Sequence, residues 1–404
     1  MVSPARDETT SIPTAAELVS RARAMVPRLI ERGLQADRDR RVPDETIAEM
    51  KAAGLFRVLQ PKRWGGYEAD LSTYYDIQMI LAEGDMSTAW IYGVVGVMPW
   101  VTALFDDRAA QEVWGKDSST LIGLSLAPAG KVTKTDGGVR ISGRWAFASG
   151  CLHCDWAYLG AFVPPEPPMP PGGMPEWRMY LVPKTDYEIM DTWYTTGLKG
   201  TGSNDIVIRD AFVPDHRIRR MIDNIGCVGP GQTVNTAPLY RIPFGQVFGG
   251  GVAYGAIGAL QGMLDAFRTY AKTRIRIGNR KTVEDPDALL VVGDAENAID
   301  ELKTMVHRNV CNLTAYAERG EIPPPDERLK YKFQMATATE RCRAIAARMF
   351  QVAGASGLYT EHRFGRILAD ITAGRQHVTN QHELHGREWG AYLLGQGMKD
   401  DPMR

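Results

Sequence analysis

The 404-residue chain is poor in several features that would narrow its function directly. Its formal net charge is only −1, and basic and acidic side chains are interspersed, so we expect no nucleic acid as a partner. No apolar run reaches the roughly 18 residues that cross a membrane. The nearest approach, residues 247–267, contains six glycines and Asp265, which favours a tightly packed buried helix. We therefore expect no membrane span.

Cysteine is also scarce. The five cysteines, an odd number, indicate free thiols in a reducing compartment. Cys151 and Cys154 have the CxxC spacing of zinc ligands, but no second CxxC or HxxxH follows at the distance of a zinc finger, so we expect no metal. Residues 1–14 are polar with two prolines and predict a disordered tail rather than a targeting peptide. The sequence thus predicts a cytoplasmic protein.

The spacing of apolar residues changes twice along the chain and predicts three domains. Residues 15–118 repeat apolar positions at helical spacing and predict a helical domain. Residues 119–225 contain short alternating runs bounded by Gly, Pro and Asp, which are typical of the strands of a small barrel or sandwich. Residues 226–404 return to long helical patterns, including 284–320 and 327–353. The predicted fold class is α+β, mainly α.

Two stretches have unusual composition. Residues 164–177, "PPEPPMPPGGMPEW", cannot pair in a sheet because proline lacks the backbone donor, so we expect a long surface hairpin loop between two strands. The glycines within residues 247–267 each cost a helix about 1 kcal/mol relative to alanine. Such a helix is expected where another backbone approaches closely, and a partner helix or a neighbouring subunit would account for it.

Three of the seven histidines lie in residues 375–385, "RQHVTNQHELH", which has a helical pattern. At about 100° per residue, His377 and His382 point roughly 140° apart, and His377 and His385 lie about 12 Å apart along the axis. They therefore cannot bind one ion. His382 and His385 are expected to pack as ordinary helix residues. His377 is either a packed polar residue near a helix start or a functional side chain.

Three short motifs are weak signals when taken singly. "RWAFASG", residues 144–150, places Ser149 at the end of a strand, where a serine is usually structural. "GLKGTGS", residues 197–203, is a tight turn leading into a strand. "QVAGASG", residues 351–357, follows a long helix; it either caps that helix or offers backbone N–H groups to a phosphate or an adenine.

The order of these motifs is more specific than any one of them. Together with "PKRWGGYE", "LSLAPAG", "YAKTRIRIG" and "ITAGRQHV" they span nearly the whole chain, and the series resembles the acyl-CoA dehydrogenase fold. That family has an N-terminal helical domain, a central small β-barrel domain and a C-terminal four-helix bundle. A flavin is held between them, and the family is usually homotetrameric. The resemblance implies the same architecture here.

One position departs from the dehydrogenases. Their α-proton base is typically a glutamate that precedes a glycine, whereas the matching residues here are Ala373 and Gly374, and alanine cannot accept a proton. Residues 87–97 and 235–244 instead look like the flavin-dependent aromatic monooxygenases of this fold. Those enzymes are oxygenase components that take FADH2 or FMNH2 from a separate NAD(P)H:flavin reductase. With O2 they form a C4a-hydroperoxyflavin, which hydroxylates a small aromatic or polycyclic substrate.

The resemblance also implies roles for individual residues. His377 matches a histidine beside the flavin C4a region, where an imidazole can donate, accept or transfer a proton. Ser149 matches a hydroxyl that hydrogen-bonds flavin N5, and Phe147 in the same motif matches a flavin contact.

Further cofactor contacts are implied for the C-terminal region. Arg274 corresponds to an arginine that binds the flavin phosphate across a subunit interface, a role that suits its planar guanidinium. Gln351 and Gly354 belong to the turn that would contact the rest of the cofactor.

The implied substrate pocket contains Ser125, Trp90 and Met98, with simple packing as the alternative for Trp90. Relatives that act on phenols commonly carry a histidine at the Met98 position, which is thought to help deprotonate the substrate. Methionine cannot do so. Either the substrate is already activated or another group acts, and His153 is a candidate.

Two rival interpretations remain open. A flavin dehydrogenase or oxidase with a relocated base would hold FAD tightly and be reduced by an acyl-CoA thioester. A binding protein that has lost activity is the second rival, against which the joint presence of Ser149, Arg274 and His377 argues.

Overall fold

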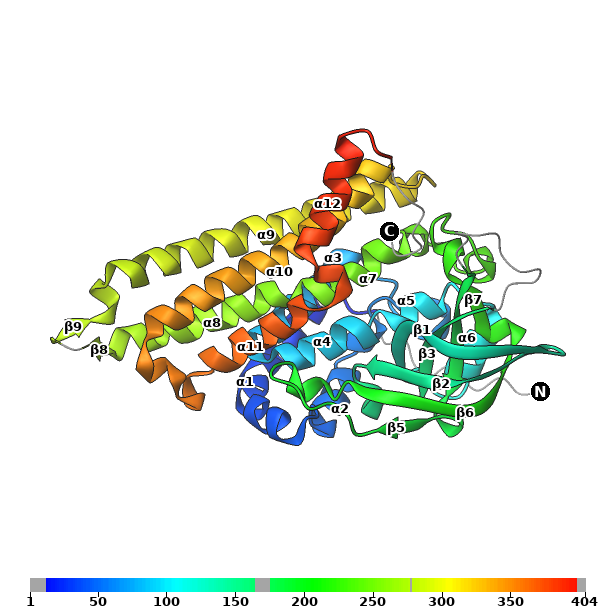
Figure 1. Cartoon of the computed structure of the whole chain (residues 1–404), viewed down its shortest axis with the longest axis horizontal. Coiled ribbons are helices and arrows are strands. Elements are labelled where there is room, and N and C mark those ends of the chain that lie inside the picture. Colours follow the sequence, from blue (N-terminus) through cyan, green and yellow to red (C-terminus); the bar gives the residue numbers. More distant parts are fainter. Residues whose placement is uncertain (1–11, 164–174, 277, 398–404) are drawn as a thin grey trace.

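The computed structural model describes residues 12–163, 175–276 and 278–397 and has the predicted order of helices, sheet and helices (Figure 1). Of the predicted N-terminal tail, residues 1–11 lie outside the described residues. The first helices are α1 (Ala15–Asp39), α2 (Asp44–Ala52), α3 (Leu71–Gly84), α4 (Met86–Val95), α5 (Met98–Thr102) and α6 (Asp107–Trp114). The last are α7 (Phe244–Ala253), α8 (Gly255–Thr273), α9 (Pro286–Glu318), α10 (Pro325–Ala353), α11 (Phe364–Arg375) and α12 (His382–Leu393).

The central sheet has seven strands in the order β5-β6-β2-β1-β3-β4-β7. They are β1 (Ile122–Thr135), β2 (Gly138–Ala148), β3 (Trp156–Phe162), β4 (Trp177–Pro183), β5 (Glu188–Met190), β6 (Asn204–Pro214) and β7 (Ile218–Arg220). The long strand β1 pairs in parallel with β3 along its first part and antiparallel with β2 along its last. Strands β3 and β4 pair antiparallel, as expected for a hairpin, although residues 164–174 of the predicted loop lie outside the described residues.

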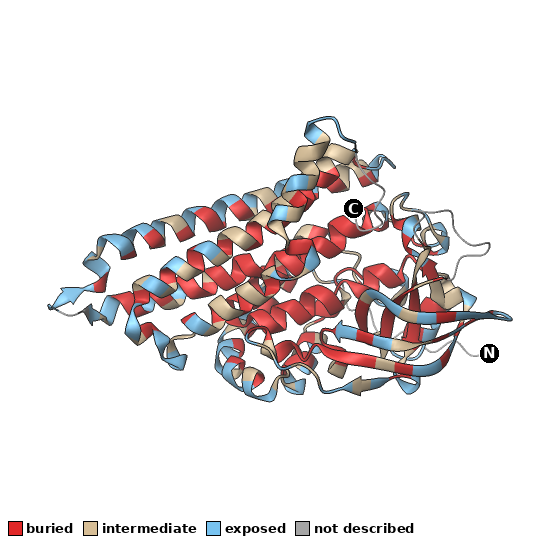
Figure 2. Ribbon diagram, in the orientation of Figure 1, coloured by how far each residue is buried: buried red, intermediate tan, exposed pale blue. Residues whose placement is uncertain are grey.

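The glycine-rich stretch forms two helices, α7 and α8, which meet at Tyr254, and not the single helix that its composition suggested. The close approach that the glycines require is made within the chain. A Cβ at Gly258 would collide with the Met79 carbonyl of α3, and one at Gly251 with the Gly93 carbonyl of α4. The N-terminal helices and the C-terminal bundle therefore share one hydrophobic core, which runs through the middle of the molecule (Figure 2).

The stretch Phe244–Thr273, which comprises α7 and α8, is long and apolar enough to cross a membrane by length and composition alone. However, 94% of its most apolar window is buried against the rest of the protein. This is how a core helix of a soluble protein packs.

Helices α4 and α11 are fixed to each other by a buried ion pair. Asp85 caps the start of α4 by accepting from the Thr88 N–H at 2.8 Å, and its other oxygen pairs with Arg366 of α11 at 2.7 Å. Both side chains are almost fully buried. Because α4 carries Trp90 and α11 leads into His377, this contact sets the relative position of two predicted site residues.

The predicted helix through residues 375–385 is interrupted, so the angular argument about its three histidines was built on the wrong geometry. Helix α11 ends at Arg375, His377 caps a short 3-10 turn, and α12 begins at His382. The buried side chain of Asn380 stabilises the break, because its amide donates to the Gly374 carbonyl at the end of α11 and to the Val252 carbonyl of α7, both at 2.9 Å.

Candidate active site

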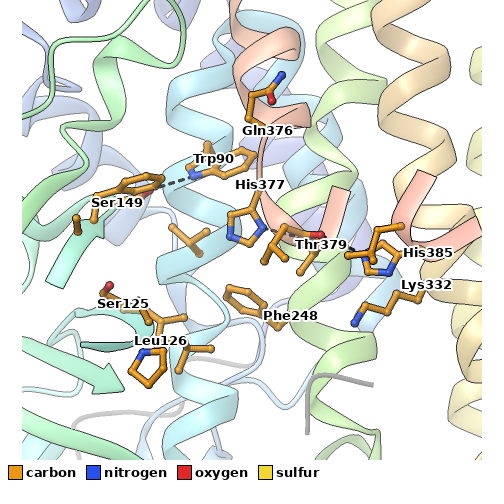
Figure 3. Close-up of a pocket in the computed structure, with 18 of the residues that line it drawn as sticks. Trp90, Ser125, Leu126, Ser149, Phe248, Lys332, Gln376, His377, Thr379 and His385 are labelled. Carbon is orange, nitrogen blue, oxygen red and sulfur yellow. Dashed lines mark hydrogen bonds between the residues drawn. The ribbon is translucent and has the colours of Figure 1, made fainter. Parts of the chain in front are cut away.

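A cavity of about 530 Å³ lies where α4, the sheet and the C-terminal helices meet (Figure 3). Its wall is mostly apolar, with a few polar side chains, as is usual for sites that bind small molecules and cofactors. The apolar part includes Val94, Leu124, Leu126, Pro128, Trp177 and Phe248.

Five of the predicted site residues line this one cavity. They are Trp90 from α4, Ser125 from β1, Phe147 from β2, Ser149, which directly follows β2, and His377, two residues after the end of α11. Residues separated by up to 287 positions in the sequence are thus brought together (Figure 3).

Ser149 is buried, with 8% of its surface exposed. The Trp90 indole N–H donates to its hydroxyl at 3.1 Å, and the Ser203 hydroxyl lies 2.7 Å away on the other side. Ser203 belongs to the "GLKGTGS" turn, so this motif contributes to the site through its hydrogen bond with Ser149. Sequence reasoning identified the turn but did not predict that it contacts Ser149.

His377 has a defined tautomer. The backbone N–H of Thr379 donates to His377 Nδ1 at 3.3 Å, and the Thr379 hydroxyl lies 2.9 Å from the same nitrogen. Because an N–H group can point only at a lone pair, the ring proton is on Nε2. Burial lowers the pKa of His377 to about 4, so the imidazole is neutral at pH 7. Trp90 packs edge-on against it, with ring centroids 5.9 Å apart.

A polar cluster at the other end of the cavity was missed by the sequence analysis. Lys332 of α10 and His385 and Glu388 of α12 line the wall, and Lys332 extends toward Phe248 (Figure 3). His385 Nε2 lies 3.1 Å from the Val378 carbonyl and its Nδ1 lies 3.1 Å from the Glu388 carboxylate. Burial and the nearby Lys332 charge lower the pKa of His385. His385 and Glu388 lie one turn apart on α12, but nothing in the sequence brings α10 to them.

Two other residues are not brought into this cavity. Met98 is fully buried in α5 and does not line it. Trp90 and Val94 share a face of α4, and Met98 would continue that face if the helix ran on, but α4 ends at Val95. His153 is buried elsewhere, with its Nδ1 3.0 Å from the Asp44 carboxylate.

Arg274, Gln351 and Gly354 line a second cavity, of about 660 Å³. It lies at the far end of the bundle, beside the small hairpin of β8 (Ile275–Arg276) and β9 (Arg280–Lys281), well away from the sheet (Figure 1). Arg280 and Arg348 add positive charge to its wall, and Asp285 and Asp287 add negative charge. Within one chain, the structure therefore does not bring these three residues together with Ser149 and His377.

The residues of the two cavities fit a flavin in different ways. In the first cavity, aromatic and aliphatic side chains suit a flat ring system, while Ser149 and His377 offer hydrogen bonds near its edge. Phe147 is 46% exposed and contacts the Trp193 ring at a centroid distance of 4.7 Å, so it is held in place as a face for such a ring. The arginines of the second cavity suit a phosphate.

Comparison with known proteins agrees with this geometry. Models of the acyl-CoA dehydrogenase N-terminal and C-terminal domains match residues 13–114 and 251–382. The flavin-dependent monooxygenase oxygenase subunit HsaA of Rhodococcus jostii strain RHA1 is 34% identical over 367 residues, which are 90% of this chain and 95% of that protein.

Solved structures agree as well. The 3-HSA hydroxylase from Rhodococcus sp. RHA1 has a TM-score of 0.90 and 34% identity, and the match covers 96% of this chain and 99% of that one. XiaF from Streptomyces sp., solved with FADH2 and glycerol, has a TM-score of 0.84 and 25% identity, with 96% and 97% covered. The fold and the family that the motif series indicated are thereby confirmed: the chain belongs to the flavin-dependent monooxygenases of the acyl-CoA dehydrogenase family.

Proposed function

We propose that this protein is the oxygenase component of a two-component monooxygenase that uses reduced flavin and O2 to hydroxylate a small aromatic or polycyclic molecule. The observation that carries the proposal is the convergence of Trp90, Ser149 and His377 on one largely apolar cavity. The description of one relative as an oxygenase subunit and the FADH2 bound to another support it. When bound, reduced flavin supplies the electrons that activate O2.

The chain's own groups would orient the reactants and exclude water. His377 is neutral and presents an Nε2–H donor, so it would hold an oxygen atom by a hydrogen bond without bringing a positive charge. Ser149 would contact the flavin edge at N5, and Ser125, from β1, lines the same cavity. With flavin and substrate bound, the apolar side chains would limit access of bulk water, which would suppress unproductive loss of hydrogen peroxide.

Lys332, His385 and Glu388 would determine how the substrate is oriented. They place polar and charged atoms at the α10–α12 end of a cavity that is otherwise mostly apolar. We infer that the substrate has an apolar aromatic body with a polar substituent that points to this end. Met98 and His153 do not line the cavity, so neither would act on the substrate directly.

The separate second cavity supports an oligomer. Arg274, Gln351 and Gly354 lie too far along the bundle to serve the flavin held by Ser149 of the same chain, so they would bind the phosphate-bearing part of a cofactor held mainly by a neighbouring subunit (Figure 1). We therefore propose that subunits share the cofactor in a homotetramer. We also propose that the protein works in the cytoplasm with a separate NAD(P)H:flavin reductase.

The decisive test supplies the purified protein with a flavin reductase, NADH, FAD or FMN, and a panel of phenols, indoles and polycyclic aromatics under ¹⁸O2. We expect a hydroxylated product that carries one ¹⁸O atom and forms only when reductase is present. Tightly bound FAD that is bleached by an acyl-CoA would instead establish the dehydrogenase rival. For that reaction Glu388 would be the candidate base, because it is the one acidic side chain that lines the cavity within the described ranges.

A further inference from the structure

Three buried hydroxyl groups form a continuous row behind the candidate active site. The Thr201 and Ser203 hydroxyls lie 2.6 Å apart, and the Ser203 and Ser149 hydroxyls lie 2.7 Å apart. Thr201 and Ser203 are each only 1% exposed, so bulk water cannot supply alternative partners. Each hydroxyl has one proton to donate, which means that the direction of every bond depends on its neighbours.

The two ends of the row fix that direction. At one end, Thr201 Oγ1 lies 2.8 Å from the Leu198 carbonyl, which can only accept, so the Thr201 proton points there. The Ser203 proton must then point to Thr201, and the Ser149 proton to Ser203. At the other end, the Trp90 indole N–H can only donate, and it donates to Ser149 at 3.1 Å.

The Leu198 end is itself anchored. The Leu198 backbone N–H donates at 2.6 Å to a side-chain carboxyl oxygen of Asp370, which is buried in α11. Because α11 also leads to His377, the turn that carries the row is tied to the same helix that positions the other side of the cavity.

Toward the cavity, the Ser149 hydroxyl can act only as a hydrogen-bond acceptor. Its proton is used by Ser203 and one lone pair is used by Trp90, so the remaining lone pair is an acceptor. A ligand N–H group matches this acceptor, whereas a ligand lone pair at the same place is repelled. Reduced flavin carries a proton on N5, and oxidised flavin has a lone pair there.

We propose that Thr201 and Ser203 are positioning residues that orient the Ser149 hydroxyl as an acceptor, and that this orientation makes the cavity select reduced over oxidised flavin. The proposal rests on the proposed function, because it takes the flavin edge to lie against Ser149. It assigns a role to the "GLKGTGS" turn: the row favours loading of the reduced cofactor and release of the spent, oxidised one.

The test measures dissociation constants of FADH2, under anaerobic conditions, and of FAD for the wild type and for Thr201→Val. Valine has the shape of threonine but cannot accept from Ser203, so the Ser203 proton is free to turn to Ser149, and the Ser149 proton is free to turn to N5 of oxidised flavin. We expect the ratio of the FAD to the FADH2 dissociation constant to fall about 10-fold, the size of one hydrogen bond. The midpoint potential of bound FAD should fall with it, by about 30 mV for a tenfold change.

Three further variants separate positioning from general damage. Ser203→Ala frees the Ser149 proton by another route and should act like Thr201→Val, so it tests the proposal even if one variant folds poorly. Thr201→Ser keeps the hydroxyl and should restore the wild-type ratio. Thr195→Val is the matched control, because the Thr195 hydroxyl donates to the Gly197 carbonyl of the same loop at 3.0 Å without touching the row.

The double variant Ser149→Ala/Thr201→Val should have the same ratio as Ser149→Ala alone, because Thr201 acts only through Ser149. A ratio within twofold of wild type in both Thr201→Val and Ser203→Ala would overturn the proposal, as would an additive effect in the double variant. If the wild type binds FADH2 and FAD equally, the selection is refuted while the oxygenase function stands. If it binds neither, the proposed function itself fails.

Discussion

The neutral state of His377 gives a prediction in which activity and stability can be measured on the same variant. His377 caps the turn before Asn380 by accepting from the Thr379 N–H through Nδ1, and it presents Nε2–H to the cavity. His377→Asn keeps the cap, because asparagine is a favoured capping residue, but its side chain is too short to replace the second nitrogen. The variant should therefore fold and lose only the donor.

The expected loss of function is that of one hydrogen bond in a water-poor site. A contribution of about 1–3 kcal/mol corresponds to a decrease of about 10- to 100-fold in product formation per reduced flavin, with the lost electrons recovered as hydrogen peroxide. The assay is single-turnover mixing of FADH2-loaded protein with O2 and substrate, followed by measurement of product and peroxide. His153→Asn is the matched control, because His153 is, like His377, a partly buried histidine, but it lies outside the cavity and pairs with Asp44.

The same variants test the protonation state. Burial lowers the pKa of His377 from 6.5 to about 4. As the pH falls from 6.5 toward 4, this histidine is therefore protonated in the unfolded chain but still neutral in the folded protein, which favours unfolding. Over that window the wild type should lose up to about 3 kcal/mol of unfolding free energy that His377→Asn does not lose. Urea unfolding at pH 7.5 and pH 4.5 measures the difference. Equal pH dependence in both proteins, or unchanged coupling in His377→Asn, would refute the assignment.

Three further changes have definite outcomes. Gly258→Ala should lower the thermal midpoint by the several degrees that correspond to about 2–3 kcal/mol, because its Cβ would collide with the rigid Met79 backbone of the neighbouring helix. Gly293→Ala is the control and should leave the thermal midpoint unchanged, because there is open space around Gly293. Met98→His should destabilise the protein without raising turnover of simple phenols, since the imidazole would be buried outside the cavity; faster turnover would contradict this. Lys332→Met should raise the KM for the native substrate more than it lowers kcat, and an unchanged KM would exclude Lys332 from substrate binding.

The sequence predicts much of this architecture because its signals are local. Helical periodicity gave α9 and α10 to within a few residues, and turn residues marked the principal strands. The short edge strands β5 and β7 were not predicted, because three residues carry too little periodicity. The break at Asn380 was missed for a different reason: its amide bonds to Gly374 and Val252 replace the helix's own hydrogen bonds, and one of these is a contact with a distant segment.

Some of the site residues could likewise be predicted from the sequence, and others could not. Motif order was enough to nominate Ser149 and His377, and the structure places both in one cavity. Met98 was nominated because it matches the position of a histidine in relatives that act on phenols, but α4 ends at Val95 and Met98 does not line the cavity. Lys332 could not be nominated at all, because its relation to the cavity depends on how α10 packs against α12.

The segment that lacks a dehydrogenase base also contacts the Trp90 ring. Gly374, next to Ala373, packs directly against the Trp90 ring: a Cβ there would lie 3.1 Å from the ring and 3.1 Å from the Met86 side chain, and either would have to shift. A small residue at position 374 thus allows the indole to lie against α11, where its N–H reaches Ser149. The segment that gives up a carboxylate base at Ala373 therefore also holds in place the donor that, with Ser203, makes Ser149 an acceptor. In this chain, Ala373 removes the proton-abstracting side chain, and Gly374 beside it leaves room for the indole that donates to Ser149.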